Sequence, residues 1–240
     1  MKKTLIAAAV LAATPFVGAN VAMAEGELPI SANISIVSDY AFRGISQTDQ
    51  RPAIQGGFDW EHDSGFYAGF WASNVSWLND LDLGTNNSLE TNLYAGYATS
   101  FGPIGVDVGL LQYYYPGDYG TAYKAAGNDD PHTLEGYIGL SWEFLTFTYS
   151  HSFTNLFGYE DSKNSKYYNL AASYEIMDGL TLDASYGYSN ITGQDNYKDW
   201  KLGVTKSYGG VDFGLHYTDT DISNSRIADG RFILSVGKSF

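Results

Sequence analysis

The sequence predicts an all-β protein, an antiparallel transmembrane β-barrel of about twelve strands. Two observations carry this prediction. Apolar and polar residues alternate in about twelve segments of roughly ten residues, which is the length of a tilted membrane-spanning strand. The connections between these segments alternate strictly between short turns and longer polar loops. Outer-membrane barrels show this asymmetry, with turns on the periplasmic side and loops outside the cell.

The composition fits this class and excludes others. The 240-residue chain contains 20 Tyr, 13 Phe, 5 Trp and 27 Gly, but only 6 Pro and no Cys. So many aromatic residues favour strands and argue against disorder. The lack of cysteine excludes disulfides and thiolate metal sites. No segment after the N-terminus has the 18 or so uninterrupted apolar residues that a membrane-spanning helix requires.

The first 24 residues have the features of an export signal. Lys2 and Lys3 precede the apolar stretch 5–17, and Ala22-Met23-Ala24 offers the small-x-small pattern that signal peptidase recognises. We therefore expect residues 1–24 to be a signal peptide cleaved near Ala24, and residues 25–240 to form a single barrel domain in the outer membrane of a Gram-negative bacterium. The mature chain would set 11 basic residues against 27 acidic ones, a net charge of −16. Nucleic acid is excluded as a partner, because its phosphates require a basic surface.

The alternation places each strand along the chain, and an even number of strands returns both termini to the periplasmic side. Short connections are expected at residues 62–65, 102–103, 143–144, 177–179 and 207–209. The longest loop, 116–131, either folds into the barrel or stays outside. The predicted strands lie near 30–43, 52–62, 65–77, 88–101, 104–115, 132–142, 144–153, 165–176, 180–189, 197–206, 210–219 and 231–240.

The distribution of charge along the strands predicts which face of the barrel wall contacts water. The ten acidic residues that we assign to the strands share the parity of Gly, Ser, Thr and Asn, opposite to Tyr, Trp, Phe and Leu, and Asp219 at the end of segment 210–219 is counted with the following loop. A ring of twelve strands is too wide for the large residues to fill its interior, so we expect them to face lipid. Closure would also satisfy every strand edge, as lipid requires. In the first two strands, Tyr40, Phe42, Phe58 and Trp60 should therefore face lipid.

The polar parity then supplies the candidate site, which is the lumen of the barrel. Ten inward acids against the basic residues Arg43, Lys201 and Arg231 leave a local charge near −7, which favours cations. Inward tyrosines, including Tyr115 and Tyr167, would narrow or plug this lumen. The candidate pore-lining residues are Asp39, Arg43, Gln55, Asp59, Glu61, Glu90, Tyr94, Asp107, Tyr113, Glu135, Tyr137, Glu175, Asp183, Asp199, Lys201, Asp212 and Arg231.

Four stretches carry a family resemblance: SDYAFRGISQ at residues 38–47, PAIQGG at 52–57, GFYAGFWASN at 65–74 and YYYPG at 113–117. They resemble the TorF-type porin family, also catalogued as the Gcw_chp conserved hypothetical family. The specific match covers roughly residues 36–140. The resemblance implies an outer-membrane barrel and a pore, without an established substrate.

The C-terminus also indicates an outer-membrane barrel. Phe240 follows the outward residues Val236, Leu234 and Phe232, and this arrangement resembles the terminal strand that the barrel assembly machinery recognises. Lys238 departs from that signature at a position that is usually apolar. The expected partners are this machinery, outer-membrane lipid, lipopolysaccharide and small hydrophilic solutes.

Catalysis and metal binding have little support in the sequence. Of the four histidines, only His216 points inward in the middle of a strand, and no spacing selects a nucleophile for it. The acidic pairs in the loops lack the spacing of a calcium loop, so we expect no catalytic residue, metal or cofactor. Two hypotheses remain. The protein is either a channel for passive diffusion of small hydrophilic solutes, with a preference for cations, or a closed barrel with a structural or ligand-binding role.

Overall fold

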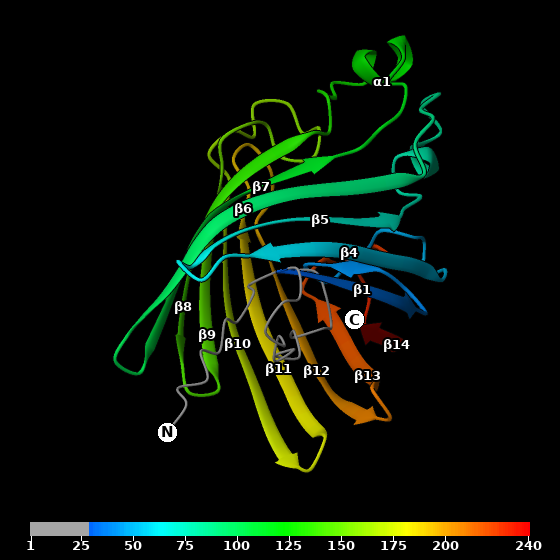
Figure 1. Cartoon of the computed structure of the whole chain (residues 1–240). Helices are drawn as coiled ribbons and strands as arrows, with labels where there is room; N and C mark the ends of the chain where they lie inside the picture. Colours follow the sequence, from blue (N-terminus) through cyan, green and yellow to red (C-terminus); the bar gives the residue numbers. More distant parts are fainter. Residues whose placement is uncertain (1–28) are drawn as a thin grey trace.

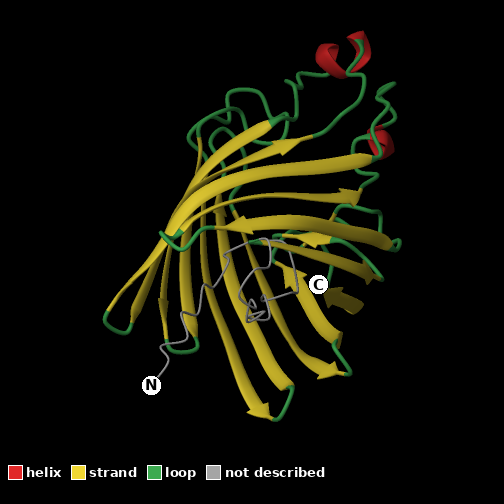
Figure 2. Cartoon of the chain, in the orientation of Figure 1, coloured by secondary structure: helices red, strands yellow, loops and turns green. Residues whose placement is uncertain are grey.

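A computed structural model describes residues 29–240, and the predicted signal peptide lies outside this range. Twelve antiparallel strands form a closed barrel, as predicted (Figure 1). Two short helices, η1 (Asn79–Leu81) and α1 (Thr121–Ala125), are the only helical segments in the described part of the chain (Figure 2). The barrel strands are β1 (Ile30–Val37), β4 (Ala53–Glu61), β5 (Phe66–Asn74), β6 (Leu89–Phe101), β7 (Ile104–Tyr114), β8 (Thr133–Trp142), β9 (Leu145–Ser152), β10 (Lys166–Met177), β11 (Leu180–Asn190), β12 (Tyr197–Tyr208), β13 (Val211–Thr220) and β14 (Arg231–Ser239).

The first strand closes the ring. β1 pairs with β14 on one side and with β4 on the other, so that Ile36 lies opposite both Val236 and Ile54. Every other barrel strand pairs with its neighbours in sequence. Closure leaves no row of unpaired backbone groups, which is the condition for spanning a hydrocarbon layer with strands.

The two faces of the wall differ as the alternation predicted. Large apolar side chains such as Leu170, Leu202 and Phe232 are exposed on the outside, with between 50% and 69% of their surface accessible. Phe58 and Trp60 belong to this exposed band, as expected. The neighbouring residues of opposite parity point into the barrel. No helix among residues 29–240 is long and apolar enough to cross a membrane.

The loops gather at one end of the barrel and the tight turns at the other. Gly102 and Gly179 adopt positive φ angles of 62° and 61° in two of these turns, a conformation that suits glycine. The longest loop, between β7 and β8, carries α1 and extends beyond the ends of the strands (Figure 1). It therefore does not fill the lumen, which answers the alternative left open by the sequence.

The predicted first strand, 30–43, is wrong in its second half. β1 ends at Val37, and residues 38–52 fold into the barrel as a segment that we call the luminal hairpin. It contains β2 (Ala41–Phe42) and β3 (Ile45–Ser46), which pair with each other. Tyr40 and Phe42 are only 2% and 8% exposed, so the prediction that they face lipid is also wrong.

The physical reason is a tight turn at the tip of the hairpin. Arg43 and Gly44 have φ angles of 47° and 81°, and a Cβ atom on Gly44 would lie 2.4 Å from Thr220 Cγ2. Only glycine fits there without displacing its neighbours. Since both arms of the hairpin are extended, the alternation of residue types continues across the point where the chain leaves the wall.

A smaller correction concerns β13. Asp219, which the prediction counts with the loop, belongs to this strand, which extends to Thr220, and lies opposite Trp200 on the outward row. The rule that strand acids point inward therefore has an exception at the loop end of β13.

Candidate functional site: the barrel lumen

The luminal hairpin contacts inward side chains around the circumference of the barrel. Tyr40 packs edge-on against Trp71 of β5, with ring centroids 5.5 Å apart. Arg43 reaches β8 and β10, and Gly44 lies against β12 and β13. Such contacts are compatible only with a position inside the ring. The hairpin therefore fills the loop-side half of the lumen.

The ion pair between Arg43 and Glu135 anchors the tip of the hairpin. One guanidinium nitrogen of Arg43, Nη2, donates to both carboxylate oxygens of Glu135, at 2.9 and 2.7 Å, and both side chains are 4% exposed. The guanidinium carbon also lies 4.2 Å from the centre of the Tyr167 ring and 4.7 Å from that of Phe42. Both distances lie within the range of cation–π contacts. Because β8 is five strands from β1 around the ring, this pair joins nearly opposite walls.

A second ion pair joins the hairpin to β14. Arg231 Nε donates to Asp39 Oδ2 at 2.5 Å, and Arg231 Nη2 donates to the carbonyl of Gly44 at 3.0 Å. The other oxygen of Asp39 accepts hydrogen bonds from Ser46 and Thr48, at 2.5 and 3.0 Å. The hairpin is thus bonded to β14 as well as across the barrel.

The outer surface of the hairpin is joined to the loop between β13 and β14. The backbone N–H of Ser46 donates to the carbonyl of Ile227 at 2.8 Å. Arg226 forms an ion pair with Asp49 and donates to the side chain of Gln50. This exposed contact is more accessible to water and salt than the buried pairs below it.

Two other carboxylates in the packed half are held by tyrosines. Glu90 accepts from Tyr40, Tyr115 and Asn92 at 3.1, 3.2 and 2.9 Å, and is 1% exposed. The Asp199 carboxylate accepts from Tyr167 at 3.1 Å. Within residues 29–240, no basic side chain lies within 4.0 Å of either carboxylate. Hydroxyl donors therefore satisfy oxygens that would otherwise be costly to bury.

The half of the lumen nearer the turns is more open. Glu61 and Glu175 are exposed, and Asp183 and Lys201 are half-buried. Asp183 accepts from Ser173 and Thr205, each at 2.9 Å, and lies 3.4 Å from His216 Nε2.

The remaining acids in this half also engage polar side chains. Tyr67 donates to Asp107 at 2.6 Å and also contacts the Tyr137 hydroxyl. Asp59 accepts from Tyr94, and Asp212 from Ser207. Six acidic side chains thus share the region with Lys201, which has no ion-pair partner among the described residues, and with His216.

The predicted pore-lining residues lie on the interior side of the barrel, either on the wall strands or on the luminal hairpin. The strand residues reach it from the wall. Gln55, for example, lies between Ser35 and Ser73 at 3.4 Å from each hydroxyl. Asp39 and Arg43 reach it from the luminal hairpin, not from a strand as predicted. The sequence pattern missed the hairpin itself, although the Arg43-Gly44 step within an alternating run is a turn signal that could have indicated it.

The described residues do not assemble a hydrolytic triad or a metal centre. His216 has Asp183 as a neighbour, but no serine or threonine hydroxyl in residues 29–240 forms a hydrogen bond with it. No three His, Asp or Glu side chains in the same range gather as metal ligands would. The described interior side chains are mainly acidic and polar, with tyrosines among them.

Comparison with known proteins agrees with this architecture. Residues 21–240 match the family described as "Bacterial protein of unknown function (Gcw_chp)". No curated protein matches the chain. Among solved structures, the fold is similar to "KdgM porin", with a TM-score of 0.56 and 10% identity over 88% of this chain and 99% of that one.

Two further structures have the same likeness of fold. One is described as "KdgM porin in complex with disordered oligogalacturonate", with a TM-score of 0.54 and 13% identity over 88% of this chain and 98% of that one. The other is "NanC porin structure in rhombohedral crystal form", with a TM-score of 0.52 and 12% identity over the same shares. At these identities the likeness concerns the fold alone. With the match over residues 21–240, the chain belongs to the Gcw_chp family and has the architecture of an outer-membrane porin-like barrel.

Proposed function

We propose that this protein is a TorF-type outer-membrane channel for passive diffusion of small hydrophilic solutes, with a preference for cations. The observation that carries the proposal is the polar, acid-rich interior of a closed twelve-strand barrel. A lumen lined by Asp, Glu, Ser, Thr and Tyr can hold water and dissolved solutes. The apolar exterior suits lipid.

The luminal hairpin would set the narrowest part of the path. On the turn side, solutes meet exposed carboxylates such as Glu61 and Glu175. On the loop side they meet the Arg43–Glu135 pair, both of whose side chains are 4% exposed. Passage through this half requires the hairpin to shift, so we infer a channel of small conductance that the hairpin controls.

Charge supports a preference for cations. Arg43 and Arg231 are each paired with a carboxylate, so the excess of acids in the open half is balanced only by Lys201 among the lysines and arginines there. Walls of low dielectric concentrate this field and enrich cations in the lumen.

The test is electrical recording of the refolded protein in a planar lipid bilayer. Discrete current steps are expected, with a reversal potential under a KCl gradient that indicates cation selectivity. This selectivity should be stronger at 0.1 M than at 1 M salt, because the screening length falls from about 10 Å to about 3 Å. Anion selectivity would contradict the proposed role of the luminal acids.

A second candidate function is a closed barrel with a structural or ligand-binding role. The packing around Arg43 favours it, since contacts of the luminal hairpin cross the lumen. Recording from the double variant Arg43→Gln/Glu135→Gln separates the two functions. A channel should show larger or more frequent steps when the tip is released. Silence in both folded proteins would favour the closed barrel.

The targeting elements complete the proposal. We propose that residues 1–24 are removed near Ala24 and that the barrel assembly machinery recognises β14 with Phe240. Phe232, Leu234 and Phe240 are all exposed on the outer side, with accessible fractions between 60% and 69%. Deletion of Phe240 should slow assembly in cells, measured as the fraction of heat-modifiable folded protein. The N-terminal sequence of the mature protein tests the cleavage site.

A further inference from the structure

The outward face of the barrel wall carries few charged side chains, and these lie near the two ends of the strands. At the loop ends of the strands lie Lys166 of β10 and Lys198 of β12. At the turn ends lie Lys206 of β12 and Lys238 of β14. Charges near the middle of a lipid-facing wall are costly, whereas those near its edges meet lipid headgroups.

The lysines at the loop end belong to a continuous cluster. Lys166 lies directly opposite His151, and Lys198 lies directly opposite Tyr188. Directly opposed residues of paired strands have Cβ atoms about 4.5–5.5 Å apart. Tyr168 lies between Tyr149 and Tyr188, with ring centroids 5.2 and 6.3 Å away. We call the cluster the tyrosine–lysine patch, and its members are Tyr149, His151, Lys166, Tyr168, Tyr188 and Lys198.

The two pairs of lysines differ in how they are satisfied. At the turn end, Lys206 Nζ donates to the carbonyl of Asp178 at 2.7 Å, and the ammonium of Lys238 lies 4.9 Å from the centre of the Phe240 ring. In the tyrosine–lysine patch, neither lysine ammonium has a hydrogen-bond or ion-pair partner within the described residues. The patch thus presents free cationic donors at a lipid-facing edge, in a chain with a formal net charge of −14.

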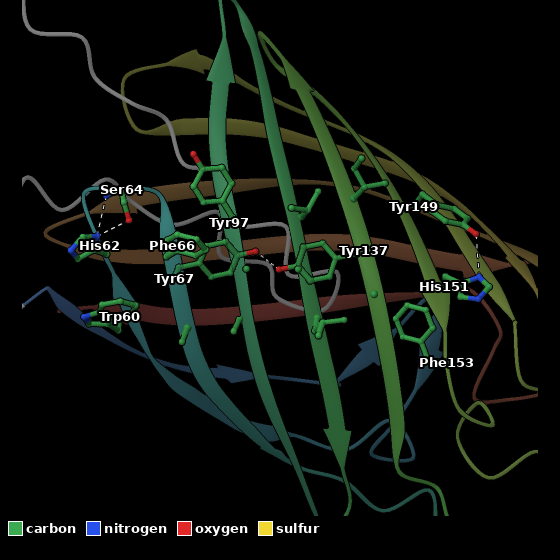
Figure 3. A pocket seen from close by; sticks show the side chains of 18 residues that line it. Trp60, His62, Ser64, Phe66, Tyr67, Tyr97, Tyr137, Tyr149, His151 and Phe153 are labelled. Atoms are coloured by element: carbon green, nitrogen blue, oxygen red, sulfur yellow. Dashed lines mark hydrogen bonds between the residues drawn. The ribbon is translucent and has the colours of Figure 1, made fainter.

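A shallow trough leads away from the patch along the outer wall. Small side chains form its floor, where Ala68 pairs with Ala95, and Gly136 pairs with His151. Phe66 and Tyr97 form one edge, with ring centroids 5.0 Å apart. Figure 3 shows Tyr149, His151 and Phe153 at one end of this hollow and Trp60, His62 and Phe66 at the other. Its volume is about 1280 Å³.

We propose that the tyrosine–lysine patch binds the phosphate of an anionic glycolipid of the outer leaflet, the lipid A part of lipopolysaccharide, and that the trough receives one of its acyl chains. Ammonium groups, an imidazole and phenol hydroxyls are donors that suit phosphate oxygens. The patch lies at the loop ends of the strands, which face outside the cell in this architecture. The trough continues the apolar surface that contacts the membrane, so an acyl chain is its natural occupant.

The charge and the position of the patch together favour lipid A over a phospholipid of the inner leaflet. A phospholipid headgroup in that leaflet would lie near the turns, where both lysines already have partners. Asp219, the acidic side chain on the outward row of β13, lies opposite Trp200 and forms no ion pair with Lys198. Asp221, just beyond β13, accepts from the backbone N–H of Lys198 at 2.7 Å. Neither Asp219 nor Asp221 forms an ion pair with a lysine ammonium of the patch in the described part of the chain.

The experiment uses the folded full-length barrel in detergent and native mass spectrometry. The probes are bisphosphorylated hexa-acyl lipid A, the same lipid without phosphates, and phosphatidylglycerol. Wild type should retain bisphosphorylated lipid A and bind the other two at least about tenfold more weakly. The variant Lys166→Gln/Lys198→Gln should lose about tenfold or more of the lipid A affinity. The matched control is Lys206→Gln/Lys238→Gln, which removes two outward lysines from the other end and should bind like wild type.

Several outcomes would overturn the site. Equal binding of all three lipids would show that the phosphates are not recognised. Equal loss in the two lysine variants would show a dependence on overall charge instead of on the patch. Unchanged affinity in Lys166→Gln/Lys198→Gln would remove the patch from binding. Since both variants change only the outer wall, single-channel recordings of the same proteins should match wild type, which separates this inference from the proposed channel.

Discussion

The two halves of the lumen are built from the same kinds of residues but differ in their contact with water. In the loop-side half, Glu90 and Glu135 are 1% and 3% exposed, whereas in the turn-side half Glu61 and Glu175 are exposed. All four glutamates are inward residues of wall strands. The difference comes from the luminal hairpin, which occupies one half and leaves the other free. An inserted segment, more than the composition of the wall, therefore decides how much water the lumen holds.

The same comparison assigns different energetic roles to similar carboxylates. Glu135 lies in a region of low dielectric, where the positive charge of Arg43 offsets the cost of burying its carboxylate. Glu61 is exposed to water, which screens its charge. The packed half thus contributes to the stability of the barrel and closes part of the lumen. The open half contributes to the negative electrostatic field inside the lumen.

The largest effect is expected at the tip of the luminal hairpin. Arg43→Ala should destabilise the barrel by about 3–5 kcal/mol, because Glu135 would remain buried without its partner. Urea unfolding in detergent micelles or lipid vesicles measures this. Arg51→Ala, which removes one partner of the exposed pair with Asp49, is the control and should cost at most about 1 kcal/mol. Similar losses of stability in the two variants would mean that water reaches the Arg43–Glu135 pair in the packed half.

The next effect compares the two faces of one strand. Leu170 is 52% exposed on the outside of β10, and the adjacent Ala171 points inward between Ser185 and Thr146. Leu170→Lys should cost about 2–4 kcal/mol near the middle of the membrane. Ala171→Lys should cost less, because water and carboxylates are accessible inside. The same unfolding measurement applies, and the reverse order would contradict the assignment of the faces.

Chemical labelling can map the boundary between the halves directly. Ser73 and Ser152 are 1% and 0% exposed in the packed half, while Thr181 and Thr205 are half-buried in the open half. Single cysteines at Thr181 and Thr205 should react with a charged thiol reagent at least about tenfold faster than those at Ser73 and Ser152. Comparable rates at the four positions would show that the hairpin opens readily on the timescale of the reaction.

A more modest effect is expected on ion selectivity. Glu61→Gln/Glu175→Gln removes two water-exposed luminal charges and should lower the ratio of cation to anion permeability, by about twofold at low salt. The control is Asp80→Asn/Asp118→Asn, which neutralises two loop residues outside the lumen and should have less effect. Reversal potentials measure both. A larger change in the control would place the selective field in the loops.

The smallest effect concerns pH and the loop between β7 and β8. Burial against Tyr114 and Tyr119 lowers the pKa of His132, although Asp130 acts in the opposite direction. Because the folded loop prefers neutral His132, its contribution to stability is present above the unfolded pKa of about 6.5 and is lost as the pH falls below it. Limited proteolysis of the loop should therefore accelerate slightly below about pH 6.5. His132→Gln should remove this pH dependence.

The wall of the barrel is predictable from the sequence alone. Twelve strands, their faces and the sorting of turns and loops follow from a period of two residues, which is a local property of extended backbone. The other eleven predicted strands agree with the structure to within about three residues at each end. The inward position of residues such as Glu90 and Asp183 follows from the same local rule.

The contents of the lumen and the clusters on the outer surface depend instead on contacts between residues that are far apart in the sequence. Arg43 was expected inside, but its partner Glu135 lies 92 residues away on a nearly opposite strand, and no local pattern encodes that distance. The alternation of Tyr40 and Phe42 is the same in a wall strand and in a hairpin, so the turn at Gly44 had to be seen in three dimensions. The tyrosine–lysine patch likewise depends on the register of β9 to β12, because pairing across strands is what brings its members together.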